Sequence, residues 1–236
     1  MIKNLFATIF VILIGLHSLA QTDLKLSYDK PAEVWTEALP VGNGRLGGMV
    51  FGRVQEELIQ LNEATLWSGG PVKNNINPTA FENLAKARAS LFQENFAQAA
   101  NDVKKMQGLY SESFLPMADL VIRQNFPGGG RTPVAPPGNI QQSDTGFTVT
   151  NYYRDLDLSR AIATTTFTIN GVKFKREVFI SNPAQAIVVR ISADKPGQIN
   201  LSLSLHSQLQ HINMVEGKNQ LLLKGKAPSH CDPNYI

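Results

Sequence analysis

The stretch AIATTTFTINGVKFKREVFI, residues 161–180, decides the fold of this chain. Asn170-Gly171 separates two runs rich in β-branched and aromatic residues, and an Asn-Gly pair in that setting is the strongest short-range signal of a two-residue β-hairpin. We therefore predict two antiparallel strands, over 161–169 and 172–180. Alternation of apolar and polar residues continues on both sides of the hairpin, as expected for strands with one buried face.

Further strands are predicted on both sides of this hairpin. Toward the C-terminus they cover 186–193, 199–206 and 220–226. Toward the N-terminus they cover 24–28, 46–54, 57–61 and the region around 120–122, with a second hairpin at Gln55-Glu56. Residues 127–146 are rich in Pro and Gly and predict a long surface loop. Many short antiparallel strands predict a mainly β fold, a large antiparallel β-sandwich.

One segment, near residues 79–107, breaks the β pattern and predicts a short two-helix insertion. Asn77-Pro78 is typical of a helix start, while Asn95 and Gly108 mark a break and an end. Apolar residues repeat at near-helical spacing: Phe81, Leu84, Leu91 and Phe92, then Phe96, Ala99, Ala100, Val103 and Met106. We expect these stripes to face the core, with the helices packed on an edge of the sandwich; a partner-binding amphipathic helix is the alternative.

The composition excludes several classes of protein. The 236 residues carry 22 Lys and Arg against 19 Asp and Glu, a formal net charge of +3, and 43% of them are hydrophobic. Gly and Pro are at ordinary levels, so collagen-like and low-complexity chains are excluded, and a chain of this composition should bury a core. The pI is near 9.0. The cations are nevertheless scattered along the sequence, which argues against nucleic acid as a partner.

The first twenty residues have the features of a signal peptide. Lys3 precedes an apolar run over 5–16 that is too short for a permanent membrane anchor, and Ser18 and Ala20 fit the small positions before a cleavage site. We predict residues 1–20 as a signal cleaved after Ala20, and 21–236 as a mature domain secreted to the periplasm. Cys231 is the single cysteine, so no intrachain disulfide supports the fold.

Two segments carry the candidate binding residues: ALPVGNGRLGGMVFG, residues 38–52, and LNEATLWSGGP, residues 61–71. A glycine-flanked turn in the first can present Asn43 and Arg45 at the edge of a cleft, where an amide and a guanidinium hydrogen-bond sugar hydroxyls. In the second, Asn62, Glu63 and Trp67 supply an amide, a carboxylate and an aromatic platform.

A purely structural interpretation of these residues stays open. The glycines can serve the turn alone while Arg45 pairs with Glu37 or Glu63, and Trp67 can fill a domain interface. Glycosidases need two carboxyl groups flanking the scissile bond. The carboxyls available are Glu37, Glu63, Asp119, Asp155 and Asp157, and nothing in their spacing indicates that two of them converge. No His or Cys cluster has metal-ligand spacing, so we predict no metal site.

Four blocks of the sequence resemble the N-terminal domain of glycoside hydrolase family 95, which comprises α-L-fucosidases and some α-L-galactosidases. They are residues 38–52, residues 61–71, FLPMADLVI at 114–122 and residues 152–197, in the order of that family. The resemblance covers about residues 24–234, nearly the whole mature chain. Departures from the family pattern, at Gly48, Ala64, Met117-Ala118 and the loop 127–138, concern loop geometry.

The resemblance implies an N-terminal β-supersandwich followed by a helical linker, an (α/α)6 barrel and a C-terminal β-domain. In such enzymes the general acid, a Glu, and the general base, an Asp assisted by an Asn, lie in the barrel. The enzymes hydrolyse terminal α-L-fucosyl linkages with inversion. Nothing in this chain matches the barrel.

We therefore expect a chain truncated before the barrel, with no catalytic residue, no cofactor and no activity alone. Its expected partners are a fucosylated glycan, through the full-length enzyme, and the missing catalytic barrel, without nucleic acid or a stable membrane anchor. A free-standing carbohydrate-binding or partner-binding β-sandwich module is the alternative.

Overall fold

The computed structural model describes residues 24–70, 76–108, 112–126 and 148–231. The chain forms two compact units, one from residues up to 65 together with 116–224, the other from 66–115 together with the residues from 225 onward. The first unit holds nearly all of the strands, and the second holds both helices.

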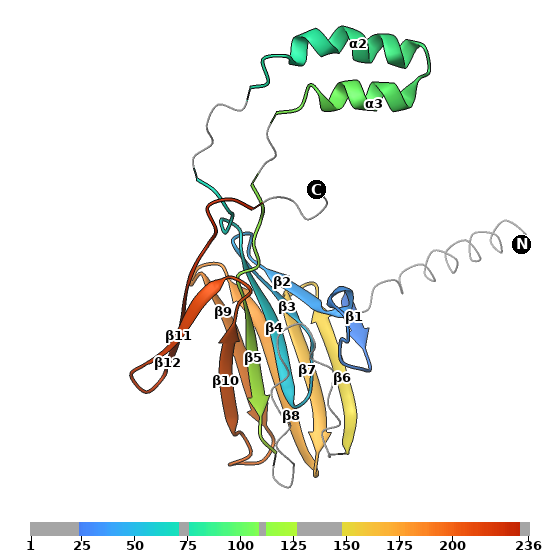
Figure 1. Cartoon of the computed structure of the whole chain (residues 1–236). Helices are drawn as coiled ribbons and strands as arrows, with labels where there is room; N and C mark the ends of the chain where they lie inside the picture. Colours follow the sequence, from blue (N-terminus) through green and yellow to red (C-terminus); the bar gives the residue numbers. More distant parts are fainter. Residues whose placement is uncertain (1–23, 71–75, 109–111, 127–147, 232–236) are drawn as a thin grey trace, which may run out of the picture. The chain divides into compact units, whose positions relative to one another are not determined.

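The first unit contains two antiparallel five-stranded sheets (Figure 1). The first sheet has the order β1-β6-β7-β8-β9, with β1 (Lys25–Tyr28), β6 (Val149–Asp157), β7 (Ile162–Ile169), β8 (Val172–Ser181) and β9 (Ala186–Ala193). The second sheet has the order β10-β5-β4-β3-β2, with β2 (Leu39–Gly42), β3 (Leu46–Val50), β4 (Glu56–Glu63), β5 (Ala118–Gln124) and β10 (Leu201–His206). A separate ribbon pairs β11 (Gln210–Glu216) with β12 (Gln220–Lys226), and a short 3-10 helix, η2, covers Trp35–Glu37.

The core lies between the two sheets because each sheet contributes one apolar face. Along β7 every second residue is buried, from Ala163 to Ile169, as the period of a strand requires. The central cluster combines residues of the second sheet with residues of the first: Leu39, Val41, Val50, Ile59 and Ile122, then Leu156, Ala163 and Val178. The predicted mainly β, antiparallel sandwich is therefore confirmed.

The hairpin predicted at Asn170-Gly171 is confirmed. Both turn residues have positive φ, 51° and 69°, as a type I′ turn requires. The flanking strands pair without interruption from Ile169 opposite Val172 to Ala163 opposite Val178. The hairpin predicted around Gln55-Glu56 is also present, although β3 ends at Val50 and β4 begins at Glu56.

The two-helix insertion is confirmed as α2 (Ala80–Phe92) and α3 (Phe96–Lys104), but the predicted helix start is wrong. Asn95 caps α3, accepting a hydrogen bond from the backbone N–H of Gln98 at 3.2 Å. Asn77 does not cap α2. Its side-chain carbonyl accepts from Thr79, and its amide donates to the carbonyls of Lys105 and Gln107, which ties the two ends of the helical hairpin together.

The apolar stripe of α2 does not face a core, contrary to expectation. Phe81 and Phe92 are 84% and 89% exposed. The buried positions of the two helices are small or polar: Asn83, Ala87 and Ser90 in α2, and Ala99 and Asp102 in α3. Ser90 donates to Asp102 at 3.1 Å. The large side chains of the stripe therefore remain available to solvent in the described structure.

Two predictions fall outside the described residues: the signal peptide 1–20 and the loop 127–146. The boundary at residue 20 and the assignment of 21–236 to one domain stay predictions. Neither described helix is long and apolar enough to cross a membrane.

Candidate functional site

A tight turn between β2 and β3 positions Asn43 and Arg45. Gly44 supplies the positive φ of 89° in this turn. The side-chain carbonyl of Asn43 accepts from the backbone N–H groups of Arg45 and Leu46, at 3.1 and 2.8 Å, and its amide donates to the carbonyl of Ser181 at 3.3 Å. Asn43 therefore uses its polar groups to hold the turn and to join it to β8.

Arg45 and Glu63 form an ion pair across the end of the β3–β4 hairpin. Arg45 Nε donates to Glu63 Oε1 at 3.0 Å, and Glu63 Oε2 accepts from the hydroxyl and the backbone N–H of Thr65, at 2.6 and 2.8 Å. These bonds, first those of Thr65 and then that of Arg45, hold the pKa of Glu63 below its usual range. Glu63 is thus a fixed, ionised carboxylate rather than a proton donor.

Glu37, the other partner considered for Arg45, has a different role. Its carboxylate accepts from the backbone N–H of Glu33 at 2.9 Å, and its backbone carbonyl accepts from Arg154 at 2.8 Å. Of the two possible pairs, the structure therefore contains Arg45–Glu63.

Asn62 is not brought together with Arg45 and Glu63. It follows Leu61, which packs against the central core cluster, and strand neighbours point to opposite faces. Across the β3–β4 pair it lies opposite Gly47. Its side-chain oxygen is buried and has no hydrogen-bond partner in the described part of the chain.

Trp67 belongs to the second unit, so it is described within that unit. It forms an isolated β-bridge with Phe114, and the two rings meet edge to face with centroids 5.3 Å apart. Both rings are partly exposed, at 49% and 42%. The ring of Trp67 therefore remains accessible, as an aromatic platform requires.

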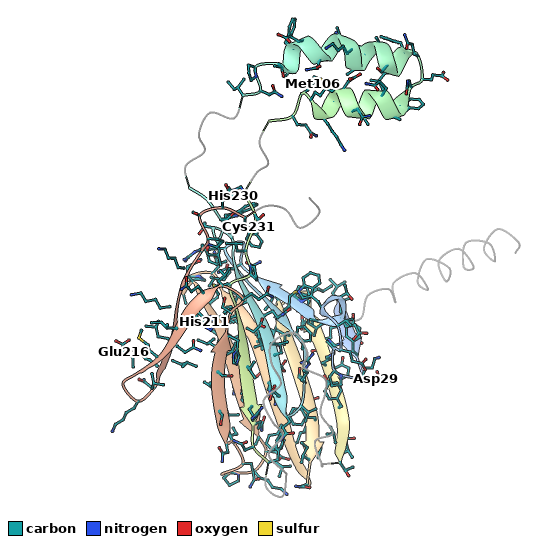
Figure 2. The ribbon with its side chains drawn as sticks, viewed as in Figure 1. Asp29, Met106, His211, Glu216, His230 and Cys231 are labelled. Atoms are coloured by element: carbon teal, nitrogen blue, oxygen red, sulfur yellow. The ribbon has the colours of Figure 1, made fainter. Side chains whose placement is uncertain are left out.

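Two further residues, Glu112 and His230, join the Trp67 segment. The Ser68 hydroxyl donates to Glu112 Oε2 at 2.6 Å, and His230 Nδ1 lies 3.1 Å from Glu112 Oε1. Figure 2 labels His230 next to Cys231 in this region. Glu112 and His230 are 118 residues apart. No local sequence pattern signals such a contact.

Arg176 and Glu57 form a deeply buried ion pair inside the sandwich. Arg176 Nη1 is 3.2 Å from Glu57 Oε2, and the two side chains are 1% and 2% exposed. Arg176 also donates to the carbonyls of Arg53 and Val54 and, at 2.9 Å, to Gln124 Oε1. The pair is closed to any ligand in solution, so we interpret it as structural.

Burial dominates the titration of this pair. It raises the pKa of the Glu57 carboxyl and lowers that of the Arg176 guanidinium, while their mutual attraction opposes both shifts. The backbone N–H of Gly52 adds a hydrogen bond to Glu57 at 2.8 Å. The network therefore fixes the β3–β4 connection against β8.

The other carboxyls considered from the sequence have separate environments. Asp155 lies 3.8 Å from Lys25 Nζ, and Asp157 accepts from Arg160 Nε at 2.8 Å. Burial raises the pKa of Asp119. Among the described residues, no group of three or more His, Cys, Asp and Glu side chains could hold a metal ion.

The two stacked antiparallel sheets define a β-sandwich domain. The chain belongs to the family described as glycosyl hydrolase family 65, N-terminal domain, whose model matches residues 26–235.

Proteins similar to this chain are described as α-fucosidases. The chain is 34% identical to alpha-L-fucosidase 2 of Arabidopsis thaliana over 214 residues, which cover 90% of this chain and 23% of the plant protein. It is 29% identical to probable alpha-fucosidase A of Aspergillus niger over 163 residues, covering 67% of this chain and 18% of that protein. These matches confirm the resemblance to the N-terminal domain of α-L-fucosidases. The chain spans about a quarter or less of the length of these relatives.

Proposed function

We propose that this chain is the N-terminal, non-catalytic part of a secreted α-L-fucosidase that hydrolyses terminal α-L-fucosyl linkages with inversion. The observation that carries the proposal is the identity of 34% to an α-L-fucosidase, which extends over 90% of this chain but only 23% of the relative. The acid and base of the reaction would then belong to a barrel in the remaining part of such an enzyme.

The environments of the carboxyls support a non-catalytic role. Glu63 is held ionised by Thr65 and Arg45, and Asp157 is paired with Arg160. Glu57 is sealed inside the sandwich against Arg176. An inverting glycosidase needs one carboxylic acid and one carboxylate about 6.5–9.5 Å apart, both open to the substrate.

In the proposed enzyme the sandwich packs against the barrel and lends a loop to the mouth of the active site. The turn between β2 and β3 that carries Arg45 is our candidate for that loop. It is fixed by hydrogen bonds, including the ion pair of Arg45 with Glu63, and yet keeps Arg45 exposed. The glycan would be bound through the full-length enzyme. Residues 1–20 would direct the protein to the periplasm and be removed after Ala20.

The test compares fucose release by the 236-residue chain with that by an enzyme encoded by the gene as it continues beyond Ile236. We expect the longer protein to release fucose from fucosyllactose and the shorter chain to release none above the blank. A reading frame that stops at Ile236 would contradict the proposal and favour a free-standing binding module. Turnover by the 236-residue chain that survives repurification and disappears in Glu63→Gln would contradict the non-catalytic assignment.

A further inference from the structure

Three segments meet around Glu112 within the second unit. The backbone N–H of Ser68 donates to the carbonyl of Ser113 at 2.9 Å, next to the bridge between Trp67 and Phe114. The Ser113 hydroxyl donates to the carbonyl of Cys231 at 3.0 Å, which brings the 228–231 segment alongside. Residues far apart in the sequence are therefore held together by hydrogen bonds to the backbone.

The Glu112 carboxylate has a fixed position in this cluster. One oxygen accepts from the Ser68 hydroxyl at 2.6 Å, and the other lies 3.1 Å from His230 Nδ1. These two bonds, in that order, lower the pKa of Glu112, so the group is ionised near neutral pH. A Cβ at Gly69 would lie 2.5 Å from Glu112 Cγ, and Gly69 has a φ of 85°. The absence of a side chain at position 69 thus makes room for the carboxylate.

The same cluster presents aromatic and polar groups to solvent together. Trp67 and Phe114 are about half exposed, as their fractions above show, and the side chains of Glu112 and His230 are 34% and 60% exposed. An exposed tryptophan face beside fixed hydrogen-bonding groups suits a pyranose ring, which has one apolar face and a rim of hydroxyls. A carboxylate accepts from sugar hydroxyls, and charge-assisted hydrogen bonds of this kind are the stronger ones.

We propose that Trp67, Phe114, Glu112 and His230 form a carbohydrate-contact site for the terminal 6-deoxy sugar of a fucosylated glycan. The apolar face and the methyl group of the sugar lie on Trp67 and Phe114, while Glu112 and His230 hydrogen-bond its hydroxyls. The choice of sugar rests on the proposed function. An interface with another protein segment, the competing use of such a cluster, is an outcome of the test below.

The chain offers a matched pair of reporters for this test. It contains two tryptophans, Trp35 and Trp67, which are 59% and 49% exposed. In Trp35→Phe the indole emission comes from Trp67 alone, and in Trp67→Phe it comes from Trp35 alone. Fucosyllactose is titrated into both variants of the 236-residue chain at pH 7, with lactose as the control sugar.

We expect a saturable change in Trp67 emission with fucosyllactose, at least about fivefold weaker binding of lactose, and no change from Trp35. Adding Glu112→Gln to the Trp35→Phe chain should weaken binding at least about fivefold, because an amide replaces the charged acceptor. Glu94→Gln, in the exposed connection between α2 and α3, is the matched control and should bind unchanged.

Two results would overturn the site. One is a flat Trp67 titration up to about 50 mM fucosyllactose in a chain whose circular dichroism matches the wild type, since weak sugar sites saturate in the millimolar range. The other is an equal response from Trp35. Either result would favour a protein interface at this cluster. Neither result would contradict the proposed function, which is tested by fucose release from the longer protein.

Discussion

Arg176 shows that a charged residue can serve as a core residue when most of its donors are matched; only its Nε is buried without a hydrogen-bond partner in the described part of the chain. Its guanidinium lies 5.1 Å from the centre of the Phe167 ring and donates to two backbone carbonyls, to Gln124 and to Glu57. Removing one partner of a buried pair costs much more than the pair contributes, because the other charge stays buried without compensation.

Arg176→Met should therefore lower the free energy of unfolding by about 3–5 kcal/mol, measured by urea denaturation. Lys175→Met is the control, because Lys175 lies next in the same strand and pairs at 2.6 Å with Glu177 on an exposed surface. It should lose about 1 kcal/mol or less. A loss below about 1 kcal/mol in Arg176→Met would show that the buried network is not needed for stability.

Arg45→Ala tests the proposed loop at the mouth of the active site in the longer enzyme. If the loop contacts the sugar, kcat/KM should fall about tenfold through a lost charge-assisted hydrogen bond, while Tm is nearly unchanged because the Arg45–Glu63 pair is exposed. A parallel fall of kcat/KM and Tm would indicate that Arg45 only supports an interface. An enzyme unchanged in both would remove Arg45 and Glu63 from the candidate site.

Asp157 gives a pH-dependent prediction. Its carboxylate accepts from Arg160 Nε and from the backbone N–H groups of Arg160 and Ser159, which lowers its pKa. A carboxyl with a lowered folded-state pKa stabilises the fold above its unfolded pKa of about 4 and loses that contribution as the pH falls through the folded value. Asp157→Asn should melt below the wild type at pH 7, and the gap in Tm should close in acid. A gap that stays constant from pH 7 to about pH 2 would contradict this assignment.

At the scale of elements, the connection between β3 and β4 requires a glycine at position 52, both for its backbone conformation and for its lack of a side chain. Gly52 has a φ of 71°, and a Cβ there would lie 2.7 Å from Arg154 Cδ and 2.8 Å from Tyr152 Oη. The Tyr152 hydroxyl already donates to the Gly52 carbonyl at 2.6 Å. The backbone of this connection therefore packs directly against β6.

Gly52→Ala should cost about 2 kcal/mol or more, because strain at positive φ adds to overpacking. Gly47→Ala is the control within β3, where a Cβ would meet only ordinary contacts, 3.6 Å from Asn62 Cβ. It should be close to neutral in the same thermal-unfolding series. Equal Tm values for the two variants would refute the close packing of this connection.

Elements specified by local chemistry could be predicted from the sequence. The turn at Asn170-Gly171 is found where predicted, and the predicted strands 186–193 and 220–226 match β9 and β12 residue for residue. In each of these segments, turn residues flank a short β-forming run, so the pattern needs no distant partner.

Elements that depend on distant contacts could not be predicted in the same way. β6 was missed because Asn151 has a positive φ of 52°, the register shifts between Thr150 and Tyr153, and the buried Arg154 interrupts the apolar alternation. In β11 the apolar residues Ile212, Met214 and Val215 are exposed, so no buried face specifies this strand.

The contacts of the candidate site likewise include one that could be predicted from the sequence and one that could not. The Arg45–Glu63 pair could be anticipated because one hairpin joins both residues. The contact of Glu112 with His230 could not, because it joins segments 118 residues apart.

At the scale of the whole molecule, apolar side chains remain exposed on the helical hairpin of the second unit. Phe81 and Phe92 lie three turns apart on the same face of α2, and Leu91, Phe96 and Val103 are also exposed. Monomers rarely leave contiguous apolar patches of more than a few hundred Å² uncovered.

The purified chain should therefore bind a hydrophobic fluorescent dye in excess of compact monomers of its size. A double variant, Phe81→Ser with Phe92→Ser, should reduce the bound dye by about half and leave Tm unchanged, because neither ring supports a core. Dye binding equal to that of ordinary monomers would indicate that the stripe is covered in solution.

The pairing of β1 with β6 has a consequence for how the protein comes to be made. Lys25 lies opposite Asp157, so the first strand to leave the ribosome must wait for more than half of the chain before its partner exists. Until then β1 has nothing to pair with, so the first sheet cannot close before Asp157 has been synthesised. Formation of the first sheet therefore depends on a contact between segments far apart in the sequence, which is expected to slow folding.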